Sequence, residues 1–432
     1  MNRLLLLGIM LYALVLLGFV ILSGGVLALI IPILVFIGAA LLYGPEEPDL
    51  TIERELSAES ASLERPVHVK LKITNNGSRL EAFHLADAPP AGLEVIDGET
   101  EVLTSLNSGE SFNLKYTVLG KRGRYRFGPI HIQTSDLFGL LIRETKVEAP
   151  GLFEFYIYPK VHPIERIPIR PRHTKVYAGY IPARIGGSGV EFFNVRTYQS
   201  GDSLRHINWR ANARHPGTFF TNEFEQERVT DVGIILDARQ RSNVEFKGET
   251  LFEHSVIATA ALADSFLNDG NRVAVLRYGD FLDWTVPGYG KLQKERILRS
   301  LARAQTGDSL VFDQLEHLPA QLFSPKSQIV LVSPLVSGDV EFLKRLRSRG
   351  YDLLIISPDP LAFEMKFIEE DEVVRTAFRL AHIERQLLFG QLHQVGIQVF
   401  NWQVDIPFDK AIGSSLPHLR PLVERNIGIL PT

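Results

Sequence analysis

The chain has 432 residues and carries 46 Lys and Arg against 50 Asp and Glu, which gives a formal net charge of -4. This length is enough for two or three domains, and 45% hydrophobic with 22% charged residues is typical of folded globular proteins. The absence of cysteine excludes thiol catalysis, iron–sulfur ligation, Cys-based zinc sites and disulfides. The slightly acidic balance gives no electrostatic basis for nucleic-acid binding, so we expect no nucleic-acid partner.

Two apolar segments open the chain, residues 4–22 and 26–43, and neither contains a charged residue. Each is just long enough to cross about 30 Å of hydrocarbon as a helix, and 23–25 (Ser-Gly-Gly) form a short connection. A cleaved signal peptide has a shorter apolar region and is not followed at once by a second span. We therefore predict a two-helix transmembrane hairpin over 1–45, held in a lipid bilayer, rather than a signal peptide or a buried core helix.

The charges beside these segments predict the orientation of the chain. Arg3 and the α-amine lie on the side to which the hairpin returns, as does Arg54, and the connecting turn is uncharged. Positive charges favour the cytoplasmic side of a membrane. We predict an integral protein of the cell membrane with two spans and cytoplasmic soluble domains.

Residues 46–160 have the pattern of an all-β domain. Residues 67–73 (VHVKLKI) alternate apolar with polar side chains, as a half-buried strand does, and Asn75-Asn76-Gly77 is a turn signal. Further strand-like runs cover 93–96, 102–106, 112–119, 125–132 and 153–158. Short strands at this spacing predict an immunoglobulin-like β-sandwich.

A cationic stretch within this domain has two readings. On a strand, Arg124 and Arg126 share one face while Tyr125 and Phe127 share the other. The arginines could form a lipid head-group or acidic-partner patch. We favour a solvated face over a packed aromatic face, because this alternation is ordinary in sandwiches.

Residues 161–230 form a linker followed by an unusual motif. Residues 161–182 are rich in Pro, Arg and His and suggest an extended linker. The motif that follows places Glu191, Asp202 and several arginines among aromatic residues. The planar guanidinium group can pair two carboxylate oxygens at once, so we predict a hydrogen-bonded ion-pair network.

The motif also carries a family resemblance. The pattern Arg196-x-Tyr198-x-x-Gly201-Asp202-x-x-Arg205-x-Ile207-x-Trp209, followed by Ala213-Arg214 and Glu223-x-Glu225, resembles the signature of the family called domain of unknown function fifty-eight. Residues 135–140 and 158–159 and the two apolar segments match its upstream pattern. The resemblance covers nearly the whole chain. It implies a von Willebrand A-like domain after the motif and a MoxR-type AAA+ ATPase as partner.

Two roles are open for the signature residues. They could form a docking or regulatory surface, or an internal brace that joins the sandwich to the C-terminal domain. We favour the brace, because structural ion-pair networks are common and resemble functional sites. On that interpretation, replacing Arg205 with Ala lowers stability more than it lowers partner binding.

Residues 231–404 have the pattern of a doubly wound α/β domain. Strands are expected at 232–236, 272–278, 328–332, 352–357 and 397–402, alternating with helices at 251–267, 291–304, 339–348 and 362–394. This alternation predicts a parallel sheet, followed by a C-terminal tail over 405–432. In such sheets ligands bind at the carboxyl ends of the strands, where Asp237 lies.

The residues around Asp237 argue against a metal site. In von Willebrand A domains this position opens a metal-binding loop, Asp-x-Ser-x-Ser, assisted by a later Thr and a later Asp. Here Arg239 and Arg241 take the serine positions, and Ser333 follows the later strand in place of an Asp. Guanidinium groups repel divalent cations and can pair with the carboxylate themselves. We predict no metal and no cofactor, with Mg²⁺ as the disfavoured alternative.

The remaining motifs indicate no catalytic group. Residues 288–291 lack P-loop spacing, and no H-E-x-x-H or G-x-S-x-G motif occurs. We therefore predict that the chain is not an enzyme. The leading function is a membrane-anchored adaptor that works with a MoxR-type AAA+ ATPase in envelope-related assembly. A metal-dependent ligand-binding module and an uncharacterised enzyme are the alternatives.

Overall fold

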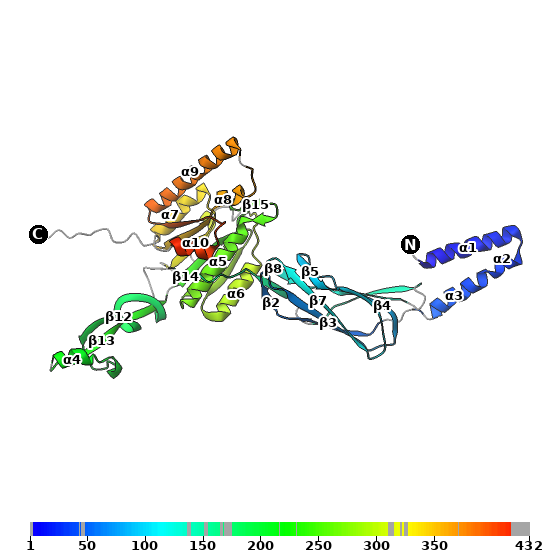
Figure 1. Ribbon diagram of the computed structural model, residues 1–432, viewed down its shortest axis with the longest axis horizontal. Coiled ribbons are helices and arrows are strands. Elements are labelled where there is room, and N and C mark those ends of the chain that lie inside the picture. The colour runs from blue at the N-terminus through cyan, green and yellow to red at the C-terminus, as the bar shows by residue number, and fades with distance from the viewer. Residues whose placement is uncertain are drawn as a thin grey trace. The chain divides into compact units, whose positions relative to one another are not determined.

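The computed structural model describes residues 3–42, 44, 48–135, 140–150, 154–164, 167, 175–215, 217–229, 231–309, 315–319, 322–323, 327–369 and 371–415, with the side chains of 3, 4, 81, 175–191, 193, 225–229, 317 and 415 left out (Figure 1). The chain divides into two compact units, Met1–Tyr158 and Pro159–Thr432. The upstream family pattern at 136–139 and the end of the predicted tail, 416–432, lie outside the described residues.

Three helices begin the first unit: α1 (Arg3–Ile21), α2 (Gly24–Ala28) and α3 (Ile30–Leu42). Within the described residues, one helical stretch is long and apolar enough to cross a membrane, Gly24–Leu42, with a mean hydropathy of 2.8. Leu5–Ile21 is also apolar but shorter. The sequence predicted two spans, and the structure supports one.

The strands that the structure describes in this unit form three sheets. The first has the order β1 (Leu50–Leu56), β3 (Val67–Asn75), β7 (Ser111–Gly120), β5 (Leu93–Gly98), and the second has the order β10 (Ile142–Val147), β9 (Ile130–Ser135), β4 (Leu80–Ala86), β6 (Glu101–Leu106). A third sheet joins β2 (Ser60–Ser62), β11 (Glu154–Tyr158) and β8 (Gly123–Arg126). All pairs in the two larger sheets are antiparallel.

Alternating side chains build the core between these sheets. Along β3, residues 67, 69, 71 and 73 are buried while their neighbours face outward, and they share one cluster with Phe83 of β4 and Ile132 of β9. The period of two seen in the sequence therefore places one face of each strand in a shared interior. The unit is a β-sandwich.

The cationic stretch splits into two strands. The predicted strand 125–132 is interrupted between β8 and β9, where Gly128 and Pro129 disfavour continued pairing. Tyr125 and Phe127 are buried, and Arg124 and Arg126 are exposed. This arrangement is the solvated face over a packed aromatic face that the alternation predicted.

Arg54 differs from its expected role as a charge beside the membrane. It lies in β1, its side chain is buried, and its Nη2 atom is 2.6 Å from Oδ1 of Asp87. The guanidinium carbon also lies 5.0 Å from the ring centroid of Phe127. A buried, paired cation does not act as a solvated flanking charge, so the orientation prediction keeps only Arg3 and the α-amine.

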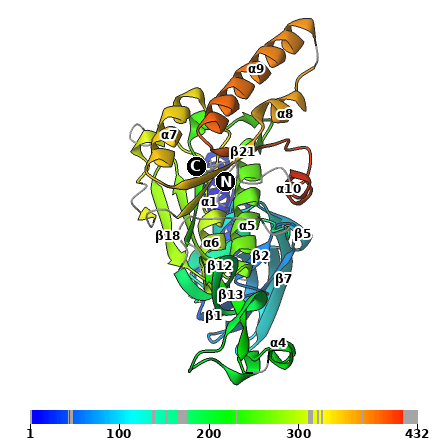
Figure 2. The same cartoon turned by 90° about the vertical axis from the view of Figure 1, so that its left-hand side faces the viewer.

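The second unit contains a six-stranded sheet with the order β18-β17-β14-β19-β20-β21. Figure 2 shows its two edge strands, β18 and β21. Its strands are β14 (Asp231–Asp237), β17 (Arg272–Tyr278), β18 (Leu282–Gly288), β19 (Gln328–Val332), β20 (Asp352–Pro358) and β21 (Gln398–Trp402). The helices are α5 (Leu251–Asn268), α6 (Gly290–Ala302), α7 (Val340–Ser348), α8 (Pro360–Met365), α9 (Glu372–Gln394) and α10 (Phe408–Ser415). Shorter elements are η2 (Gln240–Ser242), β15 (Glu245–Phe246), β16 (Glu249–Thr250), η3 (Leu315–His317) and η5 (Ser337–Asp339).

Helices cover both faces of this sheet. Val232, Ile234 and Leu236 of β14 pack into one hydrophobic cluster together with residues of α5 and α6. Ile235 packs into a second cluster together with residues of α7 and α9. Burial on both faces explains why β14 is a continuous apolar run in the sequence rather than an alternating one.

Several elements differ from their predictions. The sheet is mixed, because β18 pairs antiparallel with β17 at one edge. The predicted helix 362–394 is two helices, and Asp371 caps the second by accepting a hydrogen bond from the Val374 amide. Residues 175–182 of the predicted linker belong to strand β12 (Lys175–Thr197). The predicted tail begins with α10, whose Phe408 and Ile412 lie in the core.

Candidate functional site

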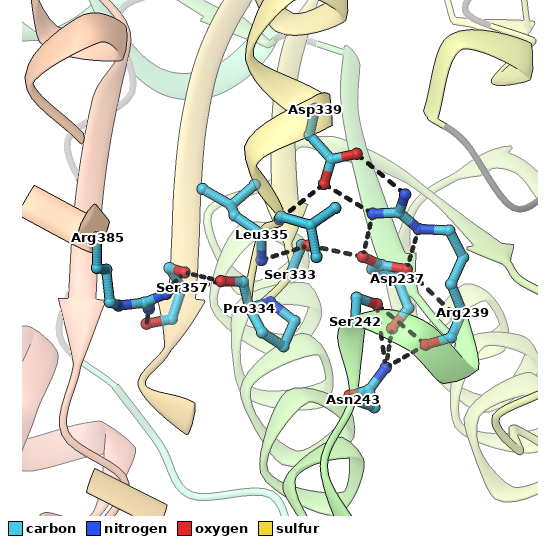
Figure 3. A network of polar contacts seen from close by, with 11 residues as sticks. Asp237, Arg239, Ser242, Asn243, Ser333, Pro334, Leu335, Asp339, Ser357 and Arg385 are labelled. Atoms are coloured by element: carbon cyan, nitrogen blue, oxygen red, sulfur yellow. Dashed lines mark hydrogen bonds and ion pairs between the residues drawn. The ribbon is translucent and has the colours of Figure 1, made fainter. Parts of the chain in front are cut away.

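The strand order reverses at β14, the strand that follows the signature motif. β14 pairs parallel with β17 on one side and with β19 on the other, so the carboxyl ends of β14 and β19 meet at a topological switch point. Asp237 ends β14 and Ser333 follows β19, and both are fully buried. The Ser333 hydroxyl donates a 2.6 Å hydrogen bond to Oδ2 of Asp237 (Figure 3).

A buried arginine lies between two carboxylates at this edge. Arg239 donates from Nε and Nη2 to the two carboxylate oxygens of Asp237, at 2.9 and 2.7 Å. It donates from Nη1 and Nη2 to the two oxygens of Asp339, at 3.0 and 2.8 Å. All three side chains are buried (Figure 3). Paired contacts of this kind are the strongest hydrogen bonds that a guanidinium group makes.

Backbone hydrogen bonds compensate for the excess of negative charge in this cluster. Burial disfavours the charged form of Arg239, but hydrogen bonds and charge from Asp237 and then Asp339 outweigh it and raise the pKa of the guanidinium. Two carboxylates face one cation. The backbone amides of Arg239 and Val336 therefore add donors, to Asp237 at 3.1 Å and to Asp339 at 3.1 Å. Each buried acid thus receives several donors.

Arg239 uses the oxygen atoms that a divalent cation at this edge of the sheet would need. Divalent cations of the Mg²⁺ type bind carboxylate and hydroxyl oxygens, and the guanidinium group uses the carboxylate oxygens of Asp237 and Asp339. Among the described residues, no group of three or more acidic or histidine side chains could hold a metal ion. Arg241, predicted to share this role, is instead exposed on η2.

A second buried arginine lies on the other side of the loop that follows β19 (Figure 3). Arg385 of α9 donates to the Pro334 carbonyl at 2.8 Å, to the Ser357 hydroxyl at 2.9 Å and to Oδ1 of Asn401 at 2.9 Å. Burial lowers its pKa to about 10, opposed by the charge of Asp359, so it stays protonated at neutral pH. The loop after β19 is therefore held by two guanidinium groups (Figure 3).

Sequence reasoning missed Asp339 and Arg385. Asp339 lies 100 residues from Arg239 in the chain, and no local pattern links them. Arg385 did have a signal, because it occupies the same helical face as Phe378 and Leu392, seven residues away on either side. A charged residue on an otherwise apolar face needs a buried partner.

The signature residues lie on a separate hairpin of β12 and β13 (Phe220–Val229). Arg196 donates to both carboxylate oxygens of Asp202, at 2.8 and 2.7 Å, and from Nε to Glu223 at 3.3 Å. The Gln199 amide also donates to Asp202, at 2.8 Å. Hydrogen bonds from Arg196 and then Gln199 lower the pKa of Asp202. The predicted ion-pair network is thus present within the hairpin.

The segment between the two strands folds back onto β13. Gly201, at φ 110°, supplies the turn after Tyr198. Ile207 pairs with Thr221, and Asn208 caps α4 (Trp209–Arg214) while its Nδ2 donates to Oδ1 of Asn222 at 2.7 Å. Sequence reasoning missed the role of the asparagines, whose spacing carries no specific signal.

The outward side of this hairpin is apolar and basic. Leu204 and Trp209 are 71% and 69% exposed, and Phe219 is 62% exposed. Arg205, Ala213 and Arg214 are exposed as well. We call Leu204, Arg205, Trp209, Arg214 and Phe219 the hairpin surface. Among the described residues, no acidic side chain pairs with Arg205, and the side chains of Glu191 and Glu225 lie outside the description.

A groove of about 430 Å³ lies between α8 and α9. Its lining is Leu361, Met365, Ile368, Val374, Arg375, Phe378, Arg379, His382 and Ile383. A nucleophile or acid–base pair would need converging polar groups, and this lining contains no carboxylate or hydroxyl group.

The signature motif and the first part of the α/β domain match a known family. Residues 194–364 match the family described as "Protein of unknown function DUF58". An uncharacterized protein of Bacillus subtilis (strain 168), YeaD, is 26% identical over 188 residues. That alignment covers 42% of this chain and 43% of YeaD, so the chain matches less than half of this relative's length.

Solved structures resemble about a quarter of the chain. The CARDB domain of the PF1109 protein of Pyrococcus furiosus is 16% identical, with a TM-score of 0.16, over 24% of this chain and 90% of that one. A FixG-related protein of Vibrio parahaemolyticus is 13% identical, with a TM-score of 0.17, over 26% and 98%. The cupredoxin domain of amoB from Nitrosocaldus yellowstonii is 10% identical, with a TM-score of 0.19, over 25% and 86%.

Removal of the buried cation should destabilise the α/β domain. We expect Arg239→Ala to lower the free energy of unfolding by about 3–5 kcal/mol, because it leaves Asp237 and Asp339 buried without a counter-charge. Urea denaturation measures this change. Arg296→Ala, at an exposed position of α6 in the same domain, is the control and should change stability by less than about 0.5 kcal/mol. Equal effects of the two variants would contradict the assignment.

Two of the signature arginines, Arg196 and Arg205, should behave differently. We expect Arg196→Ala to loosen the hairpin and speed chymotryptic cleavage at exposed Trp209 several-fold, because Asp202 and Glu223 lose their shared partner. Arg205→Ala should leave cleavage unchanged. Faster cleavage in Arg205→Ala would instead support a role of Arg205 as a brace.

The stabilisation of the hairpin by the Arg196–Asp202 ion pair should depend on pH. The pKa of Asp202 is lowered in the folded hairpin, so this stabilisation is present above the ordinary Asp pKa of about 3.9 and is lost at lower pH.

Proposed function

We propose that this chain is a membrane-anchored adaptor that binds a protein partner through the hairpin surface. The observation that carries the proposal is the exposure of Trp209 and Leu204 together with that of Arg205 and Arg214. Trp and Arg are the residue types that most often dominate binding energy at protein interfaces. The internal pairing of Arg196 with Asp202 holds this display in one conformation, which limits the entropy lost on binding.

The partner in this proposal is a MoxR-type AAA+ ATPase, acting in envelope-related assembly. Support comes from the resemblance of the signature motif to domain of unknown function fifty-eight. The net positive charge of the exposed hairpin arginines suits an acidic surface on such a partner. The proposal assigns no catalytic step to this chain.

The anchor in this proposal is a two-span hairpin with cytoplasmic soluble domains. Gly24–Leu42 can cross a bilayer, and α1 supplies the second span with the 19 residues of Arg3–Ile21. This length approaches the ~20 residues that a membrane span needs. Arg3 supports the cytoplasmic orientation through the positive-inside rule.

The α/β domain in this proposal is von Willebrand A-like and works without a metal. Helices on both faces of the sheet and Asp237 at its carboxyl edge support the likeness. Arg239 supports the metal-free state, because it is a tethered cation between Asp237 and Asp339. Binding to a partner would then be independent of divalent cation concentration.

Capture from native membranes in mild detergent tests the adaptor role. The full-length chain should recover a protein with ATPase activity, and Trp209→Ala should reduce that recovery at least about ten-fold, as loss of an interface hot spot does. Tyr289→Ala removes an aromatic side chain of similar exposure (72%) from the α/β domain and is the control. Undiminished recovery by Trp209→Ala would refute the role of the hairpin surface.

Thermal unfolding in Mg²⁺ tests the metal-free state. We expect 10 mM Mg²⁺ to leave the melting temperature unchanged relative to NaCl at equal ionic strength. A site with a dissociation constant of ~1 mM would instead add about 1.4 kcal/mol of stability. Such an increase, if Asp237→Ala abolished it, would show that the α/β domain is a metal-binding module.

A further inference from the structure

Helix α9 carries exposed apolar residues that the adaptor role does not use. It is 23 residues long, and only Arg385 and Leu392 are buried among its described side chains. Val373, Leu380, Ile383 and Leu387 are 76%, 61%, 53% and 63% exposed. Four large apolar side chains on one surface helix form a patch that soluble surfaces usually avoid.

These residues follow the seven-residue period of a coiled coil. Val373, Leu380 and Leu387 lie seven residues apart, which places them at successive a positions. Ile383 lies three residues after Leu380, at a d position, and Thr376 occupies the preceding d position. We call these five residues the α9 stripe. Buried Arg385 lies on the far side of the helix, about 120–180° from the members of the stripe at 100° per residue.

The charges beside the stripe specify a partner. Arg379 precedes Leu380 at a g position, and Glu384 follows Ile383 at an e position. In a parallel pair of helices, a g residue of one helix meets the e residue five positions further along in the other. Two identical α9 helices would therefore pair Arg379 of each copy with Glu384 of the other.

The other flanking positions place no like charges together. In the same parallel register, Glu372 meets Ala377 and Gln386 meets Gln391. In an antiparallel pair, g positions face g positions, so Arg379 meets Gln386 and the attractive contact is lost. Charge complementarity thus favours a second copy of this chain in parallel orientation.

We propose that α9 forms a parallel, in-register coiled coil with α9 of a second copy, which makes the α9 stripe a homodimer interface. The interface covers about two heptads, and Thr376 is a poor d residue, so the dimer is weak. Short helical pairs of this size are marginal. Anchoring two copies in one bilayer would raise their local concentration and favour the pair.

Cysteine cross-linking of the full-length chain tests this register. The sequence has no cysteine, so Leu380→Cys introduces a single thiol. In a parallel, in-register pair this thiol faces its own counterpart, and we expect at least about five-fold more disulfide-linked dimer than for His382→Cys. His382 is exposed and lies two residues away, about 200° further round the helix. Val373→Cys should also link with itself, which an antiparallel pair does not allow.

Charge reversal separates self-association from other occupants of the stripe. In detergent, sedimentation of Arg379→Glu should show a dimer about five-fold weaker than that of the unsubstituted chain, because two attractive contacts become repulsive. Adding Glu384→Arg in the same chain should restore it. Equal cross-linking of Leu380→Cys and His382→Cys, or no recovery in the double variant, would overturn the proposal in favour of a different partner or of the chain's own C-terminal segment.

Discussion

A buried cation between two carboxylates fixes the carboxyl edge of the α/β sheet. Arg239 bridges Asp237, at the end of β14, to Asp339, at the end of η5. A free metal ion can bind to a pair of carboxylates and leave again, whereas a guanidinium group on the same chain stays attached to that chain. Because both acids are fully buried, loss of the cation would leave charges that the interior cannot solvate. The ion pairs with Arg239 therefore hold this edge of the sheet in one arrangement.

The second arginine extends this constraint to the outside of the domain. Arg385 holds the Pro334 carbonyl and the Ser357 hydroxyl from α9, while Arg239 holds Asp237, which accepts from Ser333 in the same loop. These contacts fix the rotation of α9 about its own axis. A helix whose one face is fixed by a buried cation must present the opposite face in one direction, and that face carries the α9 stripe. The polar network thus determines which apolar side chains meet solvent.

The sequence predicted the elements whose signal is local. Alternation in β3 and the continuous apolar run of β14 identified half-buried and fully buried strands. β18 was missed because Pro287 and its polar residues do not resemble a strand, and only an edge position tolerates them. The cluster around Arg239 could be predicted only in part. Asp237 and Arg239 are two residues apart, whereas Asp339 and Arg385 reach the site through strand order and helix packing, which no window of sequence contains.

The arginines of this chain show why residue type alone does not assign function. Arg54 and Arg239 are buried with acids, and Arg196 is paired within the hairpin. Arg205 and Arg379 are exposed beside large apolar residues. In a sequence these positions are alike, because each is a cation near aromatic or aliphatic residues. In the folded chain Arg54, Arg196 and Arg239 form internal ion pairs, which distinguishes them from the exposed arginines. The cations that remain on the surface next to apolar side chains are the ones that can recognise another protein, at the hairpin surface and at the α9 stripe.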